Sequence, residues 1–420
     1  MASVCFYFQV HQPYRLRNYT IFDTTSDYFD EEKNAQICCK VAKKCYLPAN
    51  RLMLKLIDRY DGQFRISYSI TGILLEQFKE YAPEVLETFQ ELAQTGCVEF
   101  MAETYHHSLC SLYSQEEFIE QIRLHVENIQ DYFGQRPRIF RNTELVYSND
   151  LAKFIEQTGM FEGMLAEGAD HILGWKSPNY VYRPVSCKKL KLLVKNYRLS
   201  DDIAFRFSNR AWNQWPLHAD KFAAWVNSVN GNGYVVNLFM DYETFGEHQW
   251  EDTGIFEFIR QFPGEILKHP DNDFKTPSEV IASYSPVGQI DVPYTISWAD
   301  IERDLSAWCG NPMQQDALTK LYQLEQQVKS TKQSDILRDW RRLQCSDHFY
   351  YMCTKWFADG DVHKYFNPYD SPYDCYINFM NALNNLKFRC RKVLSRRNVQ
   401  PVSIPLQSIK NNSSKIMVNT

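Results

Sequence analysis

Short apolar runs alternate with amphipathic stretches from the start of the chain to about residue 295. The apolar runs have the length of strands, and the amphipathic stretches repeat their apolar positions every three or four residues, as helices do. The predicted strands include Ser3 to Val10, Phe64 to Ile70, Val98 to Ala102, Ile139 to Phe140 and Tyr234 to Asp241. Strands that alternate with helices become parallel strands joined by right-handed crossovers, so the pattern predicts an α/β barrel or a doubly wound sheet.

The pattern changes after Pro293 to longer helical periodicity. Helices are predicted at Gln314 to Ser330, Ser334 to Cys345 and Tyr373 to Val393, with an aromatic loop from Trp356 to Tyr373. Beyond Ser395 the chain is rich in Asn and Ser, which favours a frayed tail. The predicted organisation is an α/β domain over residues 1–295, a helical domain over residues 296–394 and a disordered tail over residues 395–420.

Polar clusters follow the predicted strands. His11-Gln12-Pro13, Glu103 to His107, Asn142 to Glu144 and Asp241 to Glu247 each come just after a strand. The carboxyl ends of the parallel strands of a barrel meet on one face, where barrel enzymes keep their chemistry. The sequence therefore predicts a functional site on that face.

Composition and charge exclude several classes of partner. The 420 residues carry a formal net charge of -5, from 46 Lys and Arg against 51 Asp and Glu, so no basic field attracts nucleic acid or anionic lipid. No segment approaches the ~20 apolar residues of a membrane span, and the N-terminal stretch lacks the features of a signal peptide. We expect a cytoplasmic protein that binds neither nucleic acid nor membrane, with its twelve cysteines reduced.

The aromatic content admits a carbohydrate ligand. Aromatic residues make up 15% of the chain and recur beside carboxylates and amides. Sugar rings stack on aromatic rings while their hydroxyl groups bond to carboxylates and amides, although the same aromatic residues could equally form the core. Composition alone favours the core.

Two segments place acids at strand ends. Glu144 stands among polar residues after a short strand, where a carboxylate could equally cap a helix. Asp241, Glu243 and Glu247 lie within seven residues after another apolar strand. Like charges gathered at a strand end raise one another's pKa, which keeps a carboxylic acid protonated for proton donation near neutral pH. These segments indicate acid and base chemistry.

Five motifs, in this order, resemble those of family 57 glycoside hydrolases. They are His11-Gln12-Pro13, Gly96-Cys97-Val98-Glu99 running on to Glu103-Thr104-Tyr105-His106-His107, the segment around Glu144, the segment around Asp241, and Ser297 to Trp308 followed by Gly310-Asn311. Any one of these motifs is a weak signal, whereas five in order are a strong one. The pairs Glu144-Leu145 and Asp241-Tyr242 make the chain more similar to the amylase-like members than to the glucanotransferases and branching enzymes.

The resemblance implies an incomplete (β/α)7 barrel with a C-terminal α-helical domain that contributes to the cleft. It also implies retaining cleavage of α-1,4-glucosidic bonds in α-glucans by double displacement. By position in the motifs, Glu144 is the expected nucleophile and Asp241 the expected general acid/base. The expected substrate is an α-glucan or malto-oligosaccharide, and no metal or cofactor is expected.

The other motif residues divide between substrate binding and framework. His11 could bond a sugar hydroxyl or tie the strand end to the backbone, and the motif favours the sugar contact. The residues predicted to bind substrate are His11, Gln12, Glu103, His107, Trp298 and Asp300. Arg303 is expected to hold Asp300 or Asp304 through paired hydrogen bonds. Residues 198–207 are similar to the amylase-like members, without an assigned role.

Four functional hypotheses compete. An α-amylase-type hydrolase is favoured, and a 4-α-glucanotransferase or branching enzyme would share its first half-reaction but transfer the glycosyl group to a sugar. A non-catalytic glucan-binding relative would be expected to lack Glu144 or Asp241, and both are present. A metal-dependent carbohydrate esterase would need a cluster of Asp and His ligands. The adjacent His106 and His107 do not have the spacing of such ligands.

Overall fold

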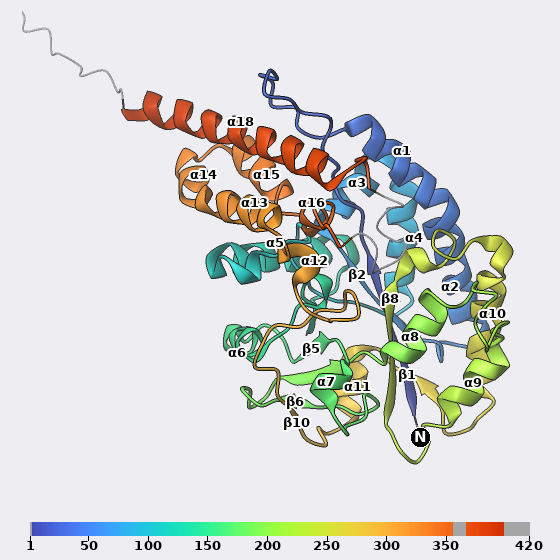
Figure 1. The fold of residues 1–420 in the computed structure, drawn as a ribbon. Coiled ribbons are helices and arrows are strands. Elements are labelled where there is room, and N and C mark those ends of the chain that lie inside the picture. Colours follow the sequence, from blue (N-terminus) through green and yellow to red (C-terminus); the bar gives the residue numbers. More distant parts are fainter. Residues whose placement is uncertain (1, 356–366, 399–420) are drawn as a thin grey trace, which may run out of the picture.

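The computed structural model describes residues 2–355 and 367–398 (Figure 1). The strands are β1 (Ser3–Val10), β2 (Ile66–Ile70), β3 (Val98–Phe100), β4 (Ile139–Phe140), β5 (Gly163–Ala166), β6 (Arg183–Pro184), β7 (Lys191–Val194), β8 (Val235–Asp241), β9 (Asp273–Phe274) and β10 (Gln289–Ile290). The α-helices up to residue 283 are α1 (Glu31–Val41), α2 (Leu47–Arg59), α3 (Gly72–Tyr81), α4 (Pro83–Gln94), α5 (Gln115–Phe133), α6 (Asn149–Thr158), α7 (Asp170–Leu173), α8 (Tyr197–Ala204), α9 (Ala219–Asn227), α10 (Ile255–Leu267) and α11 (Pro277–Ser283). Those beyond it are α12 (Ser306–Cys309), α13 (Pro312–Gln323), α14 (Glu325–Thr331), α15 (Ser334–Arg342), α16 (Ser346–Tyr350) and α18 (Pro372–Asn398).

The two larger sheets consist of parallel strands. The first has the order β3-β2-β1-β8, with β9 pairing with the start of β1, and the second has the order β4-β5-β7. Tyr7 of β1, for example, pairs with Ser67 of β2 on one side and with Phe239 of β8 on the other. Helices connect most of these strands, so the predicted α/β class with parallel strands is confirmed.

Continuous apolar sequence explains the central strand. All eight residues of β1 are buried, as expected for a parallel strand covered on both faces. The predicted bounds of β1 and β4 match the structure, whereas β2 begins two residues later than predicted and β3 ends two residues earlier.

The two sheets are linked at both edges. A parallel bridge joins Ala102, just beyond β3, to Phe140 of β4. At the other edge, the backbone N–H of Asn196 donates to the carbonyl of Asn237 at 2.9 Å, and the Asn237 side chain donates to the carbonyl of Val194 at 2.9 Å. One buried cluster takes side chains from both sheets, including Cys5, Tyr7, Ile139, Leu165, Leu193, Val235 and Phe239. The strands therefore surround a shared core.

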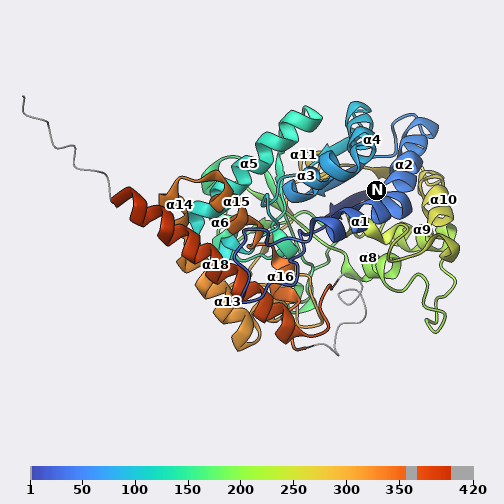
Figure 2. The same ribbon diagram turned by 90° about the horizontal axis from the view of Figure 1, so that it is seen from above.

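The helices lie on two sides of the strands. Figure 2 shows α1 to α4 and α8 to α10 on one side and α13, α14, α15 and α18 on the other, with α16 between them. β1 runs from the N-terminus towards the end of the molecule where α16 lies (Figure 1). The carboxyl ends of the central strands therefore face the helical part of the chain, which begins with α12 at Ser306.

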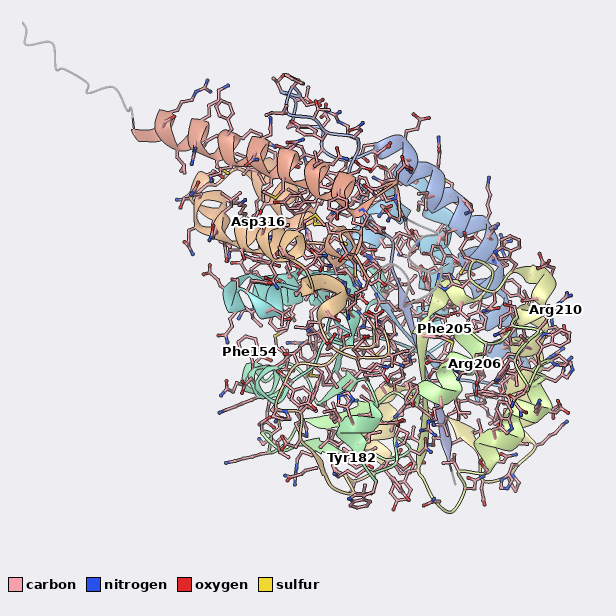
Figure 3. All side chains as sticks on the ribbon, in the orientation of Figure 1. Phe154, Tyr182, Phe205, Arg206, Arg210 and Asp316 are labelled. Atoms are coloured by element: carbon pink, nitrogen blue, oxygen red, sulfur yellow. The ribbon has the colours of Figure 1, made fainter. Side chains whose placement is uncertain are left out.

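The helical part follows the predicted periodicity with shifted boundaries. The stretch predicted as one helix from Gln314 to Ser330 forms two, α13 and α14, separated at Leu324. Asp316 on α13 (Figure 3) accepts a hydrogen bond from Tyr376 on α18 at 2.6 Å, which links the first and last of these helices. α18 continues to Asn398, so residues 395–398 are helical; residues 399–420 of the predicted tail and residues 356–366 of the predicted loop lie outside the described residues.

A buried ion pair attaches the helical part to α5, and a partly buried one attaches it to α3. Arg341, at the end of α15, donates to the buried Glu117 of α5 through Nε at 2.8 Å and Nη2 at 3.1 Å. The neighbouring Arg342 donates to Glu76 of α3 at 2.8 Å. The paired geometry of the arginine and carboxylate groups fixes direction as well as distance, so the turn between α15 and α16 has a defined position over the strand ends.

Candidate active site

Glu144 lies just beyond β4 in an unusual backbone conformation. Its φ is 56°, and that of the next residue, Leu145, is 50°, a left-handed region that residues other than glycine rarely adopt. Three groups hold its carboxylate. Oε1 accepts from His107 Nε2 at 3.0 Å and from Ser346 Oγ at 3.2 Å, and Oε2 accepts from the indole N–H of Trp298 at 2.7 Å.

His107 is hydrogen-bonded to two carboxylates. Its Nε2 lies 3.0 Å from Glu144 Oε1, and its Nδ1 lies 3.1 Å from Glu103 Oε2. Carboxylates only accept, so both ring nitrogens donate and the ring is an imidazolium. Burial lowers the pKa of His107, but the hydrogen bonds to Glu103 and Glu144 outweigh burial and raise it to about 9.

The His107 charge keeps both carboxylates ionised. Burial alone would raise the pKa of Glu144 and of Glu103, but hydrogen bonding to His107, its charge and that of Arg141 lower each pKa to about 2. Glu103 also accepts from Gln9 at 3.1 Å and from Ser69 at 2.6 Å. Since these contacts bond both its oxygens to protein groups, the predicted sugar contact of Glu103 stays a prediction.

Arg141 is a fully buried cation that sequence reasoning missed. Its Nη1 lies 3.7 Å from Glu103 Oε2, and its guanidinium lies 5.0 Å from the centre of the Trp298 ring. None of its side-chain nitrogens forms a hydrogen bond with the described residues. Lys195 also lies 5.4 Å from the Trp298 ring centre and bonds Asp201 at 3.1 Å. Trp298 thus contacts two cations as well as the Glu144 carboxylate.

Asp241, the last residue of β8, has a pKa that is shifted in the opposite direction from that of Glu144. Burial and the negative charge of Glu144 raise the pKa of Asp241 to about 6, against the opposing charges of Arg141, Lys195 and His107. No hydrogen bond to its carboxyl group occurs within the described parts of the chain. A carboxyl group with this pKa is protonated at mildly acidic pH and can donate a proton.

A π-helix supports the segment that follows Asp241. The turn η1 (Ala42–Tyr46) brings the Tyr46 hydroxyl within hydrogen-bond reach of Glu243, which also accepts from the backbone N–H of His11 at 3.3 Å. Burial and the Asp241 charge raise the pKa of Glu243 to about 8. Gly246 has a φ of 112°, and a Cβ there would lie 2.0 Å from the Lys44 carbonyl oxygen, so this close packing requires glycine.

His11 stacks directly on His107. The ring centres are 3.9 Å apart with planes inclined by 24°. His11 Nε2 lies 2.9 Å from Asp347 Oδ2, and Nδ1 lies 3.0 Å from Thr71 Oγ1. Burial and the charge of His107 lower the pKa of His11. Because the Asp347 carboxylate only accepts, Nε2 of His11 donates to it.

Gln12 and Asp300 are predicted to bind substrate, but their contacts differ from those of the residues around Glu144. Gln12 is buried; its side-chain oxygen accepts from Arg15 at 2.8 Å and its carbonyl from Gln77 at 2.8 Å. These contacts belong to the framework. Asp300 has a φ of 57°, and its buried Oδ1 has no hydrogen-bond partner among the described residues. The sugar contacts predicted for Gln12 and Asp300 stay predictions.

Arg303 pairs differently from the expectation. It does not hold Asp300 or Asp304 in the described structure; its Nη2 lies 3.6 Å from Asp201, and its Nη1 donates to the Trp298 carbonyl. Asp201 belongs to α8, so residues 198–207 contribute one buried carboxylate to this side of the site. Phe205 and Arg206 follow the end of α8 (Figure 3), and Arg206 pairs with Asp202 at 2.6 Å.

His11, His107 and Asp347 are also the one group among the described residues that could offer metal ligands. One donor atom from each lies within 4.8 Å of the others. However, stacked imidazole rings direct their in-plane lone pairs side by side, and a metal ion needs them to converge. Both nitrogens of His107 also bond carboxylates. The arrangement fits a hydrogen-bond network better than a metal site.

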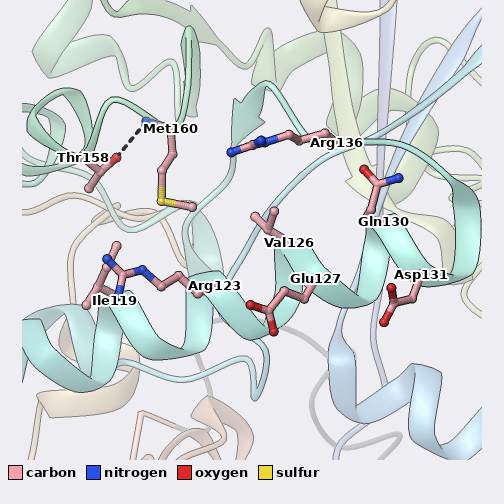
Figure 4. A pocket seen from close by; sticks show the side chains of 9 residues that line it. All are labelled: Ile119, Arg123, Val126, Glu127, Gln130, Asp131, Arg136, Thr158 and Met160. Carbon is pink, nitrogen blue, oxygen red and sulfur yellow. Dashed lines mark hydrogen bonds between the residues drawn. The ribbon is translucent and has the colours of Figure 1, made fainter.

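A separate groove lies away from these residues. It has a volume of about 750 Å³ and is lined by α5 and the end of α6, with Arg123, Glu127 and Met160 among its residues (Figure 4). None of its lining residues contacts Glu144 or Asp241, so we assign it no part in the chemistry.

The chain is similar to known carbohydrate-active proteins. The model of the family described as Glycosyl hydrolase family 57 matches residues 5–293. A protein of Methanocaldococcus jannaschii named "putative alpha-amylase" is 45% identical over 407 residues, covering 94% of this chain and 86% of that protein. Among the described residues, no helix has the length and apolar content to cross a membrane.

Two solved structures have a similar fold. A family 57 branching enzyme from Pyrococcus horikoshii gives a TM-score of 0.65 at 15% identity, with 95% of each chain covered. A 4-alpha-glucanotransferase from Thermococcus litoralis gives a TM-score of 0.59 at 16% identity, covering 95% of this chain and 60% of the other. At these identities the likeness concerns the fold alone.

Proposed function

We propose that this chain, which belongs to glycosyl hydrolase family 57, is a retaining hydrolase of α-1,4-glucosidic bonds in α-glucans, of the α-amylase type. One observation carries the proposal: the carboxyl groups of Glu144 and Asp241 have opposite pKa shifts. An ionised carboxylate together with a protonated carboxylic acid is the pair that a glycosidase needs. The motif order that resembles family 57 supports the retaining part of the proposal. The name of the M. jannaschii relative supports the choice of an amylase.

The mechanism follows from these two states. In the first step the Glu144 carboxylate forms a bond to the anomeric carbon, while Asp241 gives its proton to the leaving oxygen. In the second step Asp241, now ionised, takes a proton from water, and that water displaces Glu144 from the sugar. A sugar hydroxyl in place of water would make the same enzyme a glucanotransferase or branching enzyme.

We also propose that β1, β2, β3, β4, β5, β7 and β8 form the incomplete (β/α)7 barrel. The bridge from Ala102 to Phe140, the hydrogen bonds of Asn237 and the shared core support a closed arrangement. The barrel domain would span residues 1–295 and the helical domain residues 296–394. The twelve cysteines are free thiols, which supports the proposal of a cytoplasmic location.

The length of the products tests the proposed activity. Purified protein incubated with maltoheptaose is expected to release shorter malto-oligosaccharides only, with one new reducing end for each bond broken. Chromatography of the products over time, with a reducing-end assay in parallel, measures both. Products longer than maltoheptaose, without a gain in reducing ends, would show that the protein is a transferase and not a hydrolase.

The pH dependence of kcat/KM tests the two protonation states. Activity needs Glu144 ionised and Asp241 protonated, with pKa values of about 2 and about 6. As pH rises through 6, Asp241 loses its proton, so kcat/KM for maltoheptaose is expected to fall about tenfold per pH unit above that value. An α-glucosyl fluoride, whose leaving group needs no proton, serves as the control. An equally steep decline with the fluoride would argue against Asp241 as the acid.

A further inference from the structure

The two oxygens of the Glu144 carboxylate have different surroundings. Oε1 accepts two hydrogen bonds, from His107 and Ser346, whereas Oε2 accepts one, from Trp298. Each carboxylate oxygen has two lone-pair directions. Oε1 therefore has no free lone pair, and Oε2 keeps one.

This asymmetry depends on a contact from the helical part of the chain. Ser346 is the first residue of α16 and is fully buried, whereas the Glu144 side chain is 18% exposed. The distance of 3.2 Å from Ser346 Oγ to Oε1 is long for a hydroxyl group and a carboxylate, but the buried hydroxyl group has no contact with bulk water that could replace this bond. Ser346 is therefore placed to restrict the rotation of the Glu144 carboxylate.

The backbone ties Ser346 to the other donor on the same oxygen. The N–H of Ser346 donates to the carbonyl of His107 at 2.8 Å, and an antiparallel bridge joins Ser108 to Cys345. This junction positions the His107 ring and the Ser346 hydroxyl together on Oε1. The ion pairs of Arg341 and Arg342 hold the turn before α16 against the rest of the fold.

We propose that Ser346 is a positioning residue that, with His107, occupies Oε1 of Glu144 and leaves Oε2 as the attacking atom. The inference rests on the proposed double displacement. Oε2 forms the bond to the anomeric carbon as the bond from that carbon to the leaving oxygen breaks, and the proton of Asp241 goes to that oxygen. The helical part of the chain then supplies a group on which the rate of the first step depends.

The test measures formation of the glycosyl-enzyme directly. A 5-fluoro α-glucosyl fluoride loses fluoride without a proton and slows the second step, so the adduct on Glu144 accumulates and mass spectrometry of the full-length protein follows it. In Ser346→Ala the rate constant for labelling is expected to fall by about tenfold or more, with little change in the reagent concentration at half-saturation. Ser346→Thr, which keeps the hydroxyl group, is expected to recover most of the rate.

Ser108→Ala provides a matched control. Ser108 is a buried serine at the same junction, and its hydroxyl bonds Cys110 and Gln121 instead of Glu144, so this variant is expected to be labelled at the wild-type rate. Ser346→Ala labelled at the wild-type rate would overturn the inference, as would equal losses in Ser346→Ala and Ser108→Ala. A wild-type protein that forms no adduct on Glu144 would overturn the proposed function, and the inference with it.

Discussion

In a Glu144→Ala variant, hydrolysis is expected to fall by about 10⁴-fold or more, because no covalent glycosyl-enzyme forms without the nucleophile. When azide is added with an α-glucosyl fluoride, azide can enter the space of the missing carboxylate and attack the anomeric carbon. The configuration inverts once, so the expected product is the β-glycosyl azide. The NMR signal of the anomeric proton identifies that product.

The Asp241→Ala variant is the matched comparison. Its activity on maltoheptaose is expected to fall by about 10²- to 10⁴-fold, whereas the fluoride still forms the glycosyl-enzyme with Glu144. Azide then replaces the base-activated water, and two inversions give the α-glycosyl azide. The reverse pair of products would exchange the two roles, and wild-type activity in both variants would place the active site elsewhere.

Replacement of His107 by alanine should show how strongly one cation controls the nucleophile. The pKa of Glu144 is about 2 because His107 and Arg141 outweigh burial. In the variant the charge of His107 is gone, and the effect of burial on Glu144 outweighs that of Arg141. The pKa of Glu144 therefore rises, and activity at pH 5 is expected to fall by about 10- to 100-fold. With an α-glucosyl fluoride the rate should recover as pH rises, since Glu144 then ionises and no acid is required.

His106→Phe is the control for this experiment. His106 is also buried, and its ring lies against that of Tyr105, with centres 4.7 Å apart and planes inclined by 40°, instead of bonding either carboxylate. A phenyl ring can take that place, so we expect the pH profile of the wild-type protein. Thermal unfolding of both variants separates loss of fold from loss of charge. If a folded His107→Ala protein kept the wild-type activity on the acidic side of its pH profile, the role given to the His107 ring would be contradicted.

The strand ends were predictable because the features that mark them are local in sequence. An apolar run followed by a polar cluster located β1, β3, β4 and β8 and the groups that follow them. The predicted residues Glu144, His11, His107 and Trp298 lie in one hydrogen-bonded and stacked group. Their catalytic and binding roles stay predictions, which the variants above would test.

The groups supplied by the helical part were not predictable in the same way. Ser346 and Asp347 begin a short helix, where serine and aspartate are common for local capping reasons alone. Only the docking of α15 on α5 brings them to Glu144 and His11. Arg141 follows β4 directly, but the sequence does not show that a charged residue there is fully buried. β5 and β7, of four residues each, have little periodicity to detect.

The hydrogen bond between His11 and Asp347 joins residues 336 positions apart, which has a consequence for synthesis on the ribosome. At about 5 to 20 residues per second, roughly 20 to 70 s separate the addition of the two residues. For about the last third of that time, Glu144 and Asp241 are both already in the nascent chain, but the donors from α16 are not. A partly synthesised chain therefore cannot assemble this network, and glucan in the same compartment meets a complete site only after the helical part has emerged and docked.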